Sequence, residues 1–299
     1  MTDMFEGLRT ATVNGVSLAY REQGTGEPVV LVHGSASDIR TWEHQIPDIG
    51  AGYRALAYSR RYARPNDDIE AGVDDQMLPH VDDLAAFLQS LDVTAAHLVG
   101  HSWGGFIALL TAIRHPRLVR SLVLMEPPVL SLFVSTPPRP IEILRLFLRQ
   151  PATAFAIVQF GAGTFAPAEK AFRRSDDEAA MRVFSRGVLG KASYERLSQA
   201  RKQQIRDNRK AGRAQVLGAG FPPLSGEEVR AVQAPALLLV GEQSPVILRR
   251  LTDSLHELLP DSERVEIADA SHLMHEDNPG MVNAAILGFL EGRASPTSG

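Results

Sequence analysis

The feature that most constrains this sequence is a Gly-His-Ser-Trp-Gly stretch, residues 100–104, which lies between an apolar run and a helical pattern. Residues 95–99 are typical of a short buried strand, and residues 103–115 are typical of a helix. A serine on such a sharp turn has a strained backbone, for which only small neighbours leave room. The turn would place the Ser102 hydroxyl beside the helix N-terminus, where developing negative charge is favoured. We therefore expect Ser102 to be a nucleophile; the alternative is a serine that caps the helix.

Apolar strands alternate with amphipathic helical segments along much of the chain, and this alternation predicts a parallel α/β sheet covered on both faces. Residues 29–32 are a continuous apolar run of the kind found in buried parallel strands, and residues 119–128 are expected to form another buried strand that ends in a carboxylate. The alternation stops at about residue 127 and resumes at residue 235. In between, the pattern predicts helices over residues 141–148, 152–160, 178–189 and 194–211.

The composition is that of an ordinary globular enzyme. Hydrophobic residues make up 44% of the chain and charged residues 22%, and a net charge of −4 gives no sign of a polyanionic partner. The absence of cysteine excludes disulfides, thiolate metal sites and cysteine nucleophiles. The first six residues lack a secretion pattern, and no apolar run approaches the roughly 20 residues of a membrane span. We therefore expect a cytoplasmic protein that binds neither nucleic acid nor membrane.

The serine motif, an upstream His33-Gly34 turn and a downstream histidine together resemble the α/β-hydrolase family over roughly residues 10–291. The resemblance implies an α/β-hydrolase fold: a mostly parallel eight-stranded sheet flanked by helices, with a helical cap inserted after the sixth strand. It divides the chain into a core of residues 1–127 and 233–299 and a cap, or lid, of residues 128–232. Residues 293–299 are expected to form a disordered tail.

A serine hydroxyl needs a base within hydrogen-bond reach, and His272 is the candidate. It lies between the last expected strand and the last expected helix, which matches the position of the family's catalytic histidine. Histidine suits this role because its unperturbed pKa of about 6.5 lets it take and return a proton near neutrality. The rival base is His275.

The expected acid departs from the commonest family pattern. After the seventh strand, where the family usually has an aspartate, this chain has Ser244, which cannot stabilise an imidazolium as a carboxylate does. A minority of the family places the acid after the sixth strand, and this chain has Glu126 there. Ser102, Glu126 and His272 follow the family's order of nucleophile, acid and base. Glu242 is the alternative acid, and Glu126 could instead be only a strand-end carboxylate.

The resemblance also implies where a substrate would bind. The backbone N–H groups of Ser35 and Trp103 would form the oxyanion hole, and His33 would be a structural hydrogen-bonding residue. Further candidates for substrate contact are Gly34, Phe133, Phe160 and Leu273. Residues 59–66 replace the family's usual Asp-x-Arg-Gly loop, and a solvent-facing role fits them at least as well as substrate contact. The basic run 196–213 is expected to be a solvated helix face.

The implied reaction is hydrolysis of a carboxylic ester or lactone of a small apolar substrate through an acyl-enzyme, without metal or cofactor. Lactone hydrolases acting on zearalenone are similar in placing a glutamate after the sixth strand. They present a cap tryptophan, however, whereas the tryptophans here are Trp42 and Trp103. The alternatives are a carbon–carbon bond hydrolase of diketone type, a small-molecule receptor with little turnover, and a cofactor-free oxygenase or haloperoxidase. A homodimer is a possible assembly.

Overall fold

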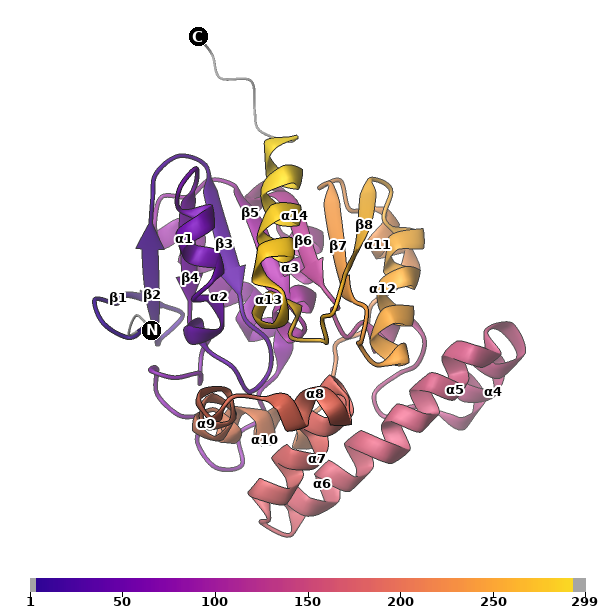
Figure 1. Ribbon diagram of the computed structural model, residues 1–299. Coiled ribbons are helices and arrows are strands. Elements are labelled where there is room, and N and C mark those ends of the chain that lie inside the picture. The colour runs from indigo at the N-terminus through magenta and orange to yellow at the C-terminus, as the bar shows by residue number, and fades with distance from the viewer. Residues whose placement is uncertain (1–3, 293–299) are drawn as a thin grey trace.

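The central element is an eight-stranded sheet in a computed structural model that describes residues 4–292 (Figure 1). The strands are β1 (Arg9–Val13), β2 (Val16–Gln23), β3 (Pro28–Val32), β4 (Arg54–Tyr58), β5 (Ala96–His101), β6 (Val119–Met125), β7 (Ala236–Gly241) and β8 (Ser262–Ile267). Their order is β1-β2-β4-β3-β5-β6-β7-β8. The first two pairs, β1 with β2 and β2 with β4, are antiparallel, and the remaining pairs are parallel. The expected mostly parallel eight-stranded sheet is thus confirmed.

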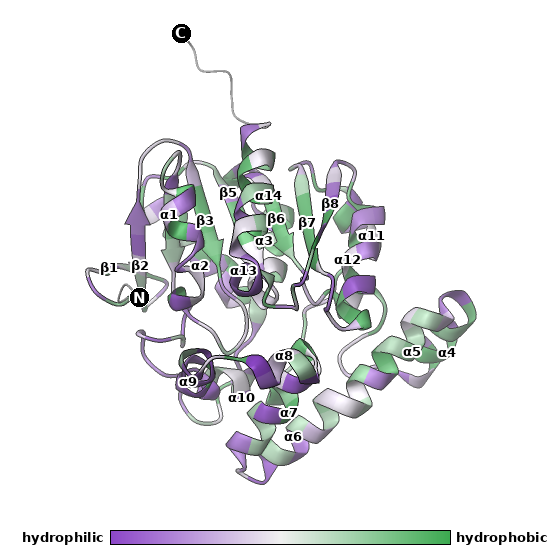
Figure 2. Cartoon of the chain, in the orientation of Figure 1, coloured by the Kyte–Doolittle hydropathy of each residue, from purple (hydrophilic) through white to green (hydrophobic). Residues whose placement is uncertain are grey.

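Helices cover both faces of this sheet. The flanking helices are α1 (Gln45–Ile49), α2 (Met77–Ser90), α3 (Trp103–Arg114), α11 (Gly226–Arg230), α12 (Val246–Leu258), α13 (Met274–Asp277) and α14 (Pro279–Glu291), with 3₁₀ turns at Ile39–Trp42, Pro116–Leu118 and Leu130–Leu132. Residues of α2, α3 and α12 pack on one face, and residues of α1 and α14 pack on the other. The sheet needs helices on both faces because its strands are apolar on both faces. In β3, Val30 and Val32 pack against the first helix layer, and Val29 and Leu31 pack against the second. Strands β6 and β7 accordingly carry the hydrophobic colour in Figure 2.

The chain between β6 and β7 adds helices beyond the carboxyl ends of the strands, at the bottom of Figure 1. They are α4 (Pro140–Arg149), α5 (Pro151–Phe160), a π-helical turn (Gly161–Phe165), α6 (Ala166–Arg173), α7 (Asp177–Leu189), α8 (Lys191–Arg196), α9 (Gln199–Asp207) and α10 (Arg209–Leu217). The helices expected over 141–148, 152–160 and 178–189 are therefore confirmed. The division into a core (1–127 and 233–299) and a cap (128–232) stays a prediction.

The single helix expected over residues 194–211 was wrong, because the structure breaks it into α8, α9 and α10. Ser198 caps α9 by accepting a hydrogen bond from the N–H of Arg201. The side chain of Asn208 separates α9 from α10 while it donates to Asp38 Oδ2 at 2.7 Å. Helix α6 was missed because Pro167 resembles a break, although proline fits the first turn of a helix.

The hairpin formed by α4 and α5 carries exposed apolar side chains. They are Ile141, Leu144, Phe147, Leu148, Phe155 and Val158.

Among residues 4–292, no helix combines the length and apolar character that crossing a membrane requires. The tail expected at residues 293–299 lies outside the described residues, and the homodimer stays a prediction.

Candidate active site

Ser102 occupies the turn between β5 and α3 in a strained conformation, with φ 51° and ψ −119°. The neighbouring glycines make this turn possible. A Cβ on Gly100 would lie 2.6 Å from the carbonyl oxygen of Gly104, and one on Gly104 would lie 2.1 Å from that of Val32. The Ser102 N–H donates to the carbonyl of Met125 at 2.8 Å, but its side chain makes no capping hydrogen bond to α3. The hydroxyl is therefore not used as a helix cap.

The expected base and acid meet directly. Nδ1 of His272 lies 2.6 Å from Oε2 of Glu126, and both side chains are almost fully buried. The other carboxylate oxygen of Glu126 accepts the N–H of Gly241 at 3.0 Å, so the end of β7 holds the acid in place. Nε2 of His272 has no hydrogen-bond partner among the described residues. With Nδ1 engaged by a carboxylate, Nε2 is the nitrogen that can exchange a proton.

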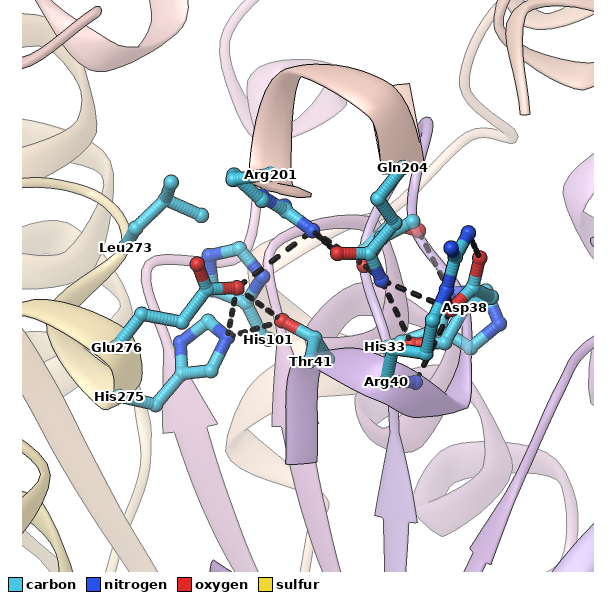
Figure 3. A network of polar contacts seen from close by, with 12 residues as sticks. His33, Asp38, Arg40, Thr41, His101, Arg201, Gln204, Leu273, His275 and Glu276 are labelled. Carbon is cyan, nitrogen blue, oxygen red and sulfur yellow. Dashed lines mark hydrogen bonds and ion pairs between the residues drawn. The ribbon is translucent and has the colours of Figure 1, made fainter. Parts of the chain in front are cut away.

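The rival residues lie elsewhere. Glu242 is exposed, and its carboxylate accepts the backbone N–H of Asp269. His275 is buried beside Thr41, with Nε2 2.8 Å from the Thr41 hydroxyl, in the network shown in Figure 3. The structure thus brings Glu126, and not Glu242, to the imidazole of His272, and His272, not His275, lines the cavity with Ser102.

A cavity of about 660 Å³ lies over the serine turn and is lined by Ser102 and His272. Ser102 and His272 form no hydrogen bond with each other in this structure, although catalytic hydrogen bonds often tighten only around a bound substrate. Among the expected contact residues, Ser35, Trp103, Phe160 and Leu273 are on the wall, and Gly34 and Phe133 are not. The other aromatic side chains that line it are Phe165, Phe184 and Phe221.

The turn after β3 supplies the second edge of the site. Gly34 lies behind the cavity wall, where a Cβ would be 2.9 Å from Nδ1 of His101, so a side chain would press into the serine turn. The next residue, Ser35, faces the cavity, and its N–H has no acceptor among the described residues. Trp103 begins α3, where helix N–H groups have no intrahelical partner. Both expected oxyanion donors therefore lie at the cavity that Ser102 lines.

Polar residues that the sequence did not identify join this turn to the inserted helices. The hydroxyl of Ser35 donates to the amide oxygen of Gln215 on α10. The amide nitrogen of Gln215 donates to Oδ2 of Asp75 at 2.7 Å, and Oδ1 of Asp75 lies 2.7 Å from Nε2 of His80. Gln215 and Asp75 both line the cavity. No sequence signal could have paired Ser35 with a residue 180 positions away.

Arg201 corrects the expectation that the basic run 196–213 is a solvated face. It is buried, lines the cavity from α9, and donates through Nη1 to Gln204 Oε1 at 2.6 Å and Ser37 Oγ at 3.2 Å (Figure 3). Burial of His275, followed by the positive charge of Arg201, holds the pKa of His275 well below the ordinary value.

Among the described residues, no group of three or more histidine, aspartate or glutamate side chains could hold a metal ion.

Comparison with known proteins finds relatives and solved structures that resemble this chain. A bifunctional epoxide hydrolase 2 of Sus scrofa is 27% identical over 308 residues, covering 93% of this chain and 54% of the relative. The chain spans about half the length of the curated relatives it matches. Two solved structures share the fold. An esterase from Thermogutta terrifontis has a TM-score of 0.75 at 21% identity, covering 96% and 99% of the two chains. The enol-lactonase from Burkholderia xenovorans LB400 has a TM-score of 0.74 at 17% identity, covering 95% and 100%.

One family profile, described as the alpha/beta hydrolase fold, matches residues 27–279. This stretch contains the serine turn, the carboxylate after β6 and the histidine loop after β8. Because the match covers most of the chain, the protein belongs to the alpha/beta hydrolase family.

Proposed function

We propose that this protein hydrolyses carboxylic esters or lactones of small apolar molecules through an acyl-enzyme formed on Ser102. One observation carries the proposal. The 2.6 Å contact between Glu126 and His272 leaves Nε2 of the imidazole unpaired, and His272 and Ser102 line the same cavity. This arrangement is the one that turns a serine hydroxyl into a nucleophile.

In the proposed reaction, Ser102 Oγ attacks the substrate carbonyl while Nε2 of His272 takes the hydroxyl proton. The Glu126 carboxylate stabilises the imidazolium that results. The N–H groups of Ser35 and Trp103 stabilise the oxyanion of the tetrahedral intermediate. The imidazolium then returns its proton to the leaving alcohol, and a water molecule activated by His272 hydrolyses the acyl-enzyme.

The cavity supports a small and mainly apolar substrate. Its volume of about 660 Å³ lies within the range of small-molecule sites. Phe160, Phe165 and Phe184 contribute to its wall and come from the inserted segment. We therefore propose that residues 128–232 act as a cap that roofs the site and selects the substrate. The esterase and enol-lactonase that share the fold fit this substrate class.

The nucleophile type argues against transfer of the epoxide hydrolase activity to this chain. A carboxylate that opens an epoxide forms an ester, which water can then cleave. The hydroxyl of Ser102 would form an ether, which this site has no means to cleave. Attack of Ser102 on an acyl carbon instead gives an ester, and the same imidazole can promote its hydrolysis.

The test is hydrolysis of p-nitrophenyl butyrate and of δ-valerolactone by the wild type, Ser102→Ala and Ser185→Ala. Ser185 is a matched control because it is a buried serine on the same cavity wall. We expect Ser102→Ala to lower kcat by roughly 10⁴- to 10⁶-fold, and Ser185→Ala to retain most activity. Full activity in Ser102→Ala would refute the serine mechanism. Tight binding of a small ligand without turnover by the wild type would instead favour a receptor.

A further inference from the structure

Arg60 is a buried arginine whose guanidinium is bonded to the turn that carries Ser35. It follows β4 and is only 3% exposed. From the sequence, residues 59–66 were instead expected to face solvent or to contact substrate. Nε donates to the carbonyl of His33 at 3.0 Å, and Nη2 donates to the carbonyl of Gly34 at 2.8 Å. Nη1 lies 3.2 Å from Nδ1 of His80. All three nitrogens of this buried cation are therefore engaged, and two of them hold backbone carbonyls.

The carbonyl of Gly34 receives a second donor from His33. Nε2 of His33 accepts the backbone N–H of Arg60 at 2.9 Å, so the ring proton resides on Nδ1. Nδ1 then donates to the carbonyl of Gly34 at 2.9 Å. Burial, followed by the charge of Arg60, holds the pKa of His33 well below its ordinary value, which keeps this tautomer neutral. Two N–H groups thus fix the orientation of one carbonyl.

Fixing that carbonyl fixes the N–H group on the other side of the same peptide. In a planar trans peptide, the C=O of Gly34 and the N–H of Ser35 point in opposite directions. The carbonyl is drawn toward Arg60 and His33, and the Ser35 N–H has no acceptor among the described residues. Hydrogen bonds to the carbonyl also polarise the amide and strengthen its N–H as a donor.

Arg60 contacts the second oxyanion residue as well. The centre of its guanidinium lies 4.7 Å from the centroid of the Trp103 ring, within the range of a cation–π contact. The ring of His80 meets the same indole edge-on, at 4.9 Å between centroids. One side chain therefore joins the Ser35 turn to the first residue of α3.

We infer that Arg60 is a positioning residue of the oxyanion hole, which holds the Gly34–Ser35 peptide in place against Trp103 so that both N–H groups serve the same developing charge. The inference rests on the proposed acyl-transfer function. Arg60 does not touch the substrate; it acts through the peptide that does.

The test compares Arg60→Gln with Arg61→Gln. Arg61 is a matched control because it is the next residue and forms an ion pair with Asp83 at 2.5 Å, without a hydrogen bond to the Ser35 turn among the described residues. Losing an oxyanion donor typically costs about 10²–10³ in kcat, and a misaimed donor costs less. We expect Arg60→Gln to lower kcat on p-nitrophenyl butyrate by roughly 10- to 100-fold with KM nearly unchanged. It should weaken inhibition by a trifluoromethyl ketone, which mimics the tetrahedral intermediate, by a similar factor. Arg61→Gln should change neither quantity.

Arg60→Gln removes a buried positive charge, so a second variant guards against loss of the fold. Arg60→Lys keeps the charge but lacks the planar fork that reaches both backbone carbonyls, and we expect it to lose kcat and inhibitor affinity in the same direction. Wild-type kcat and inhibitor affinity in a folded Arg60 variant would overturn the inference, as would an equal loss in Arg61→Gln. If Ser102→Ala were fully active, the proposed function would fail and this inference with it. If Ser102→Ala lost activity while the Arg60 variants kept it, this inference would fail and the proposed function would stand.

Discussion

Nδ1 of His272 lies 2.6 Å from Oε2 of Glu126, although 146 positions separate the two residues in the chain. The carboxylate leaves the end of β6, and the imidazole leaves the loop after β8. The strand between them contributes the N–H of Gly241, which donates to the second oxygen of Glu126 at 3.0 Å. The end of β7, after which the family usually has its acid, thus holds the carboxylate that we propose as the acid, one strand earlier.

This geometry predicts unequal effects of two glutamate substitutions. In Glu126→Gln, the new amide can donate to Nδ1 of His272, which moves the ring proton to Nε2 and prevents that nitrogen from acting as a base. We expect kcat on p-nitrophenyl butyrate to fall by about 10⁴-fold, the scale seen when a triad acid becomes an amide. Glu242→Gln is the control, because its exposed carboxylate contacts only the N–H of Asp269 among the described residues. Loss of activity in Glu242→Gln alone would contradict the proposed triad.

Two glycine-to-alanine substitutions should change stability in opposite directions. A Cβ on Gly104 would lie 2.1 Å from the carbonyl oxygen of Val32, so Gly104→Ala should lower the free energy of unfolding by about 3 kcal/mol or more. Gly288 is exposed in α14, and its Cβ would meet nothing within 4 Å. Gly288→Ala should therefore raise the free energy of unfolding by about 0.5–1 kcal/mol. Urea denaturation measures both, and a stable Gly104→Ala protein would show that the serine turn is packed differently.

Phe160 should control the length of acyl chain that the cavity accepts. It lines the cavity from the end of α5 and meets Phe165 edge-on, at 5.4 Å between ring centroids. Phe160→Ala should raise the ratio of kcat/KM for p-nitrophenyl octanoate over butyrate by about 10-fold, since each methylene in an apolar pocket contributes about 1–3 kcal/mol. Phe155→Ala, on the same helix but 61% exposed, should leave the ratio unchanged. Equal ratios in the two variants would place Phe160 outside the acyl site.

Stability should fall in mild acid because several histidines are buried in the neutral form. Burial is the main cause that holds the pKa of His33, His101 and His275 well below the ordinary 6.5. Below pH 6.5 the unfolded chain binds protons that the native protein does not. The free energy of unfolding therefore decreases as the pH is lowered. Each histidine contributes a slope of up to about 1.4 kcal/mol per pH unit, and none above about pH 7.5. Urea denaturation at pH 8, 7, 6 and 5 checks this, and constant stability from pH 7 to 5 would contradict it.

The sequence predicts those parts of the site that local pattern determines. Residues 100–104 can form a strained turn because of their own glycines, and Glu126 was identifiable as a carboxylate that ends a buried strand. The role of His272 was instead implied by the family resemblance, which places the catalytic histidine between the last strand and the last helix. The choice between Glu126 and Glu242 needed the structure, because it depends on which side chain reaches the imidazole.

The residues that the sequence missed act through partners far away in the chain. Arg60 and Arg201 look like parts of solvated basic runs, yet each is buried against acceptors from other segments. Asn208 breaks a good helical pattern because Asp38, 170 positions away, binds its side chain. Such residues carry ordinary local propensities, so only the folded neighbourhood reveals what they do.

The most direct test of the account is covalent labelling of the protein by a p-nitrophenyl phosphonate, followed by peptide mass spectrometry. The account predicts one phosphonyl group per chain on the peptide that contains Ser102, release of one equivalent of p-nitrophenol, and no labelling of Ser102→Ala. An unlabelled Ser102 in a protein that still hydrolyses p-nitrophenyl butyrate, or a label on another residue that abolishes this activity, would contradict it.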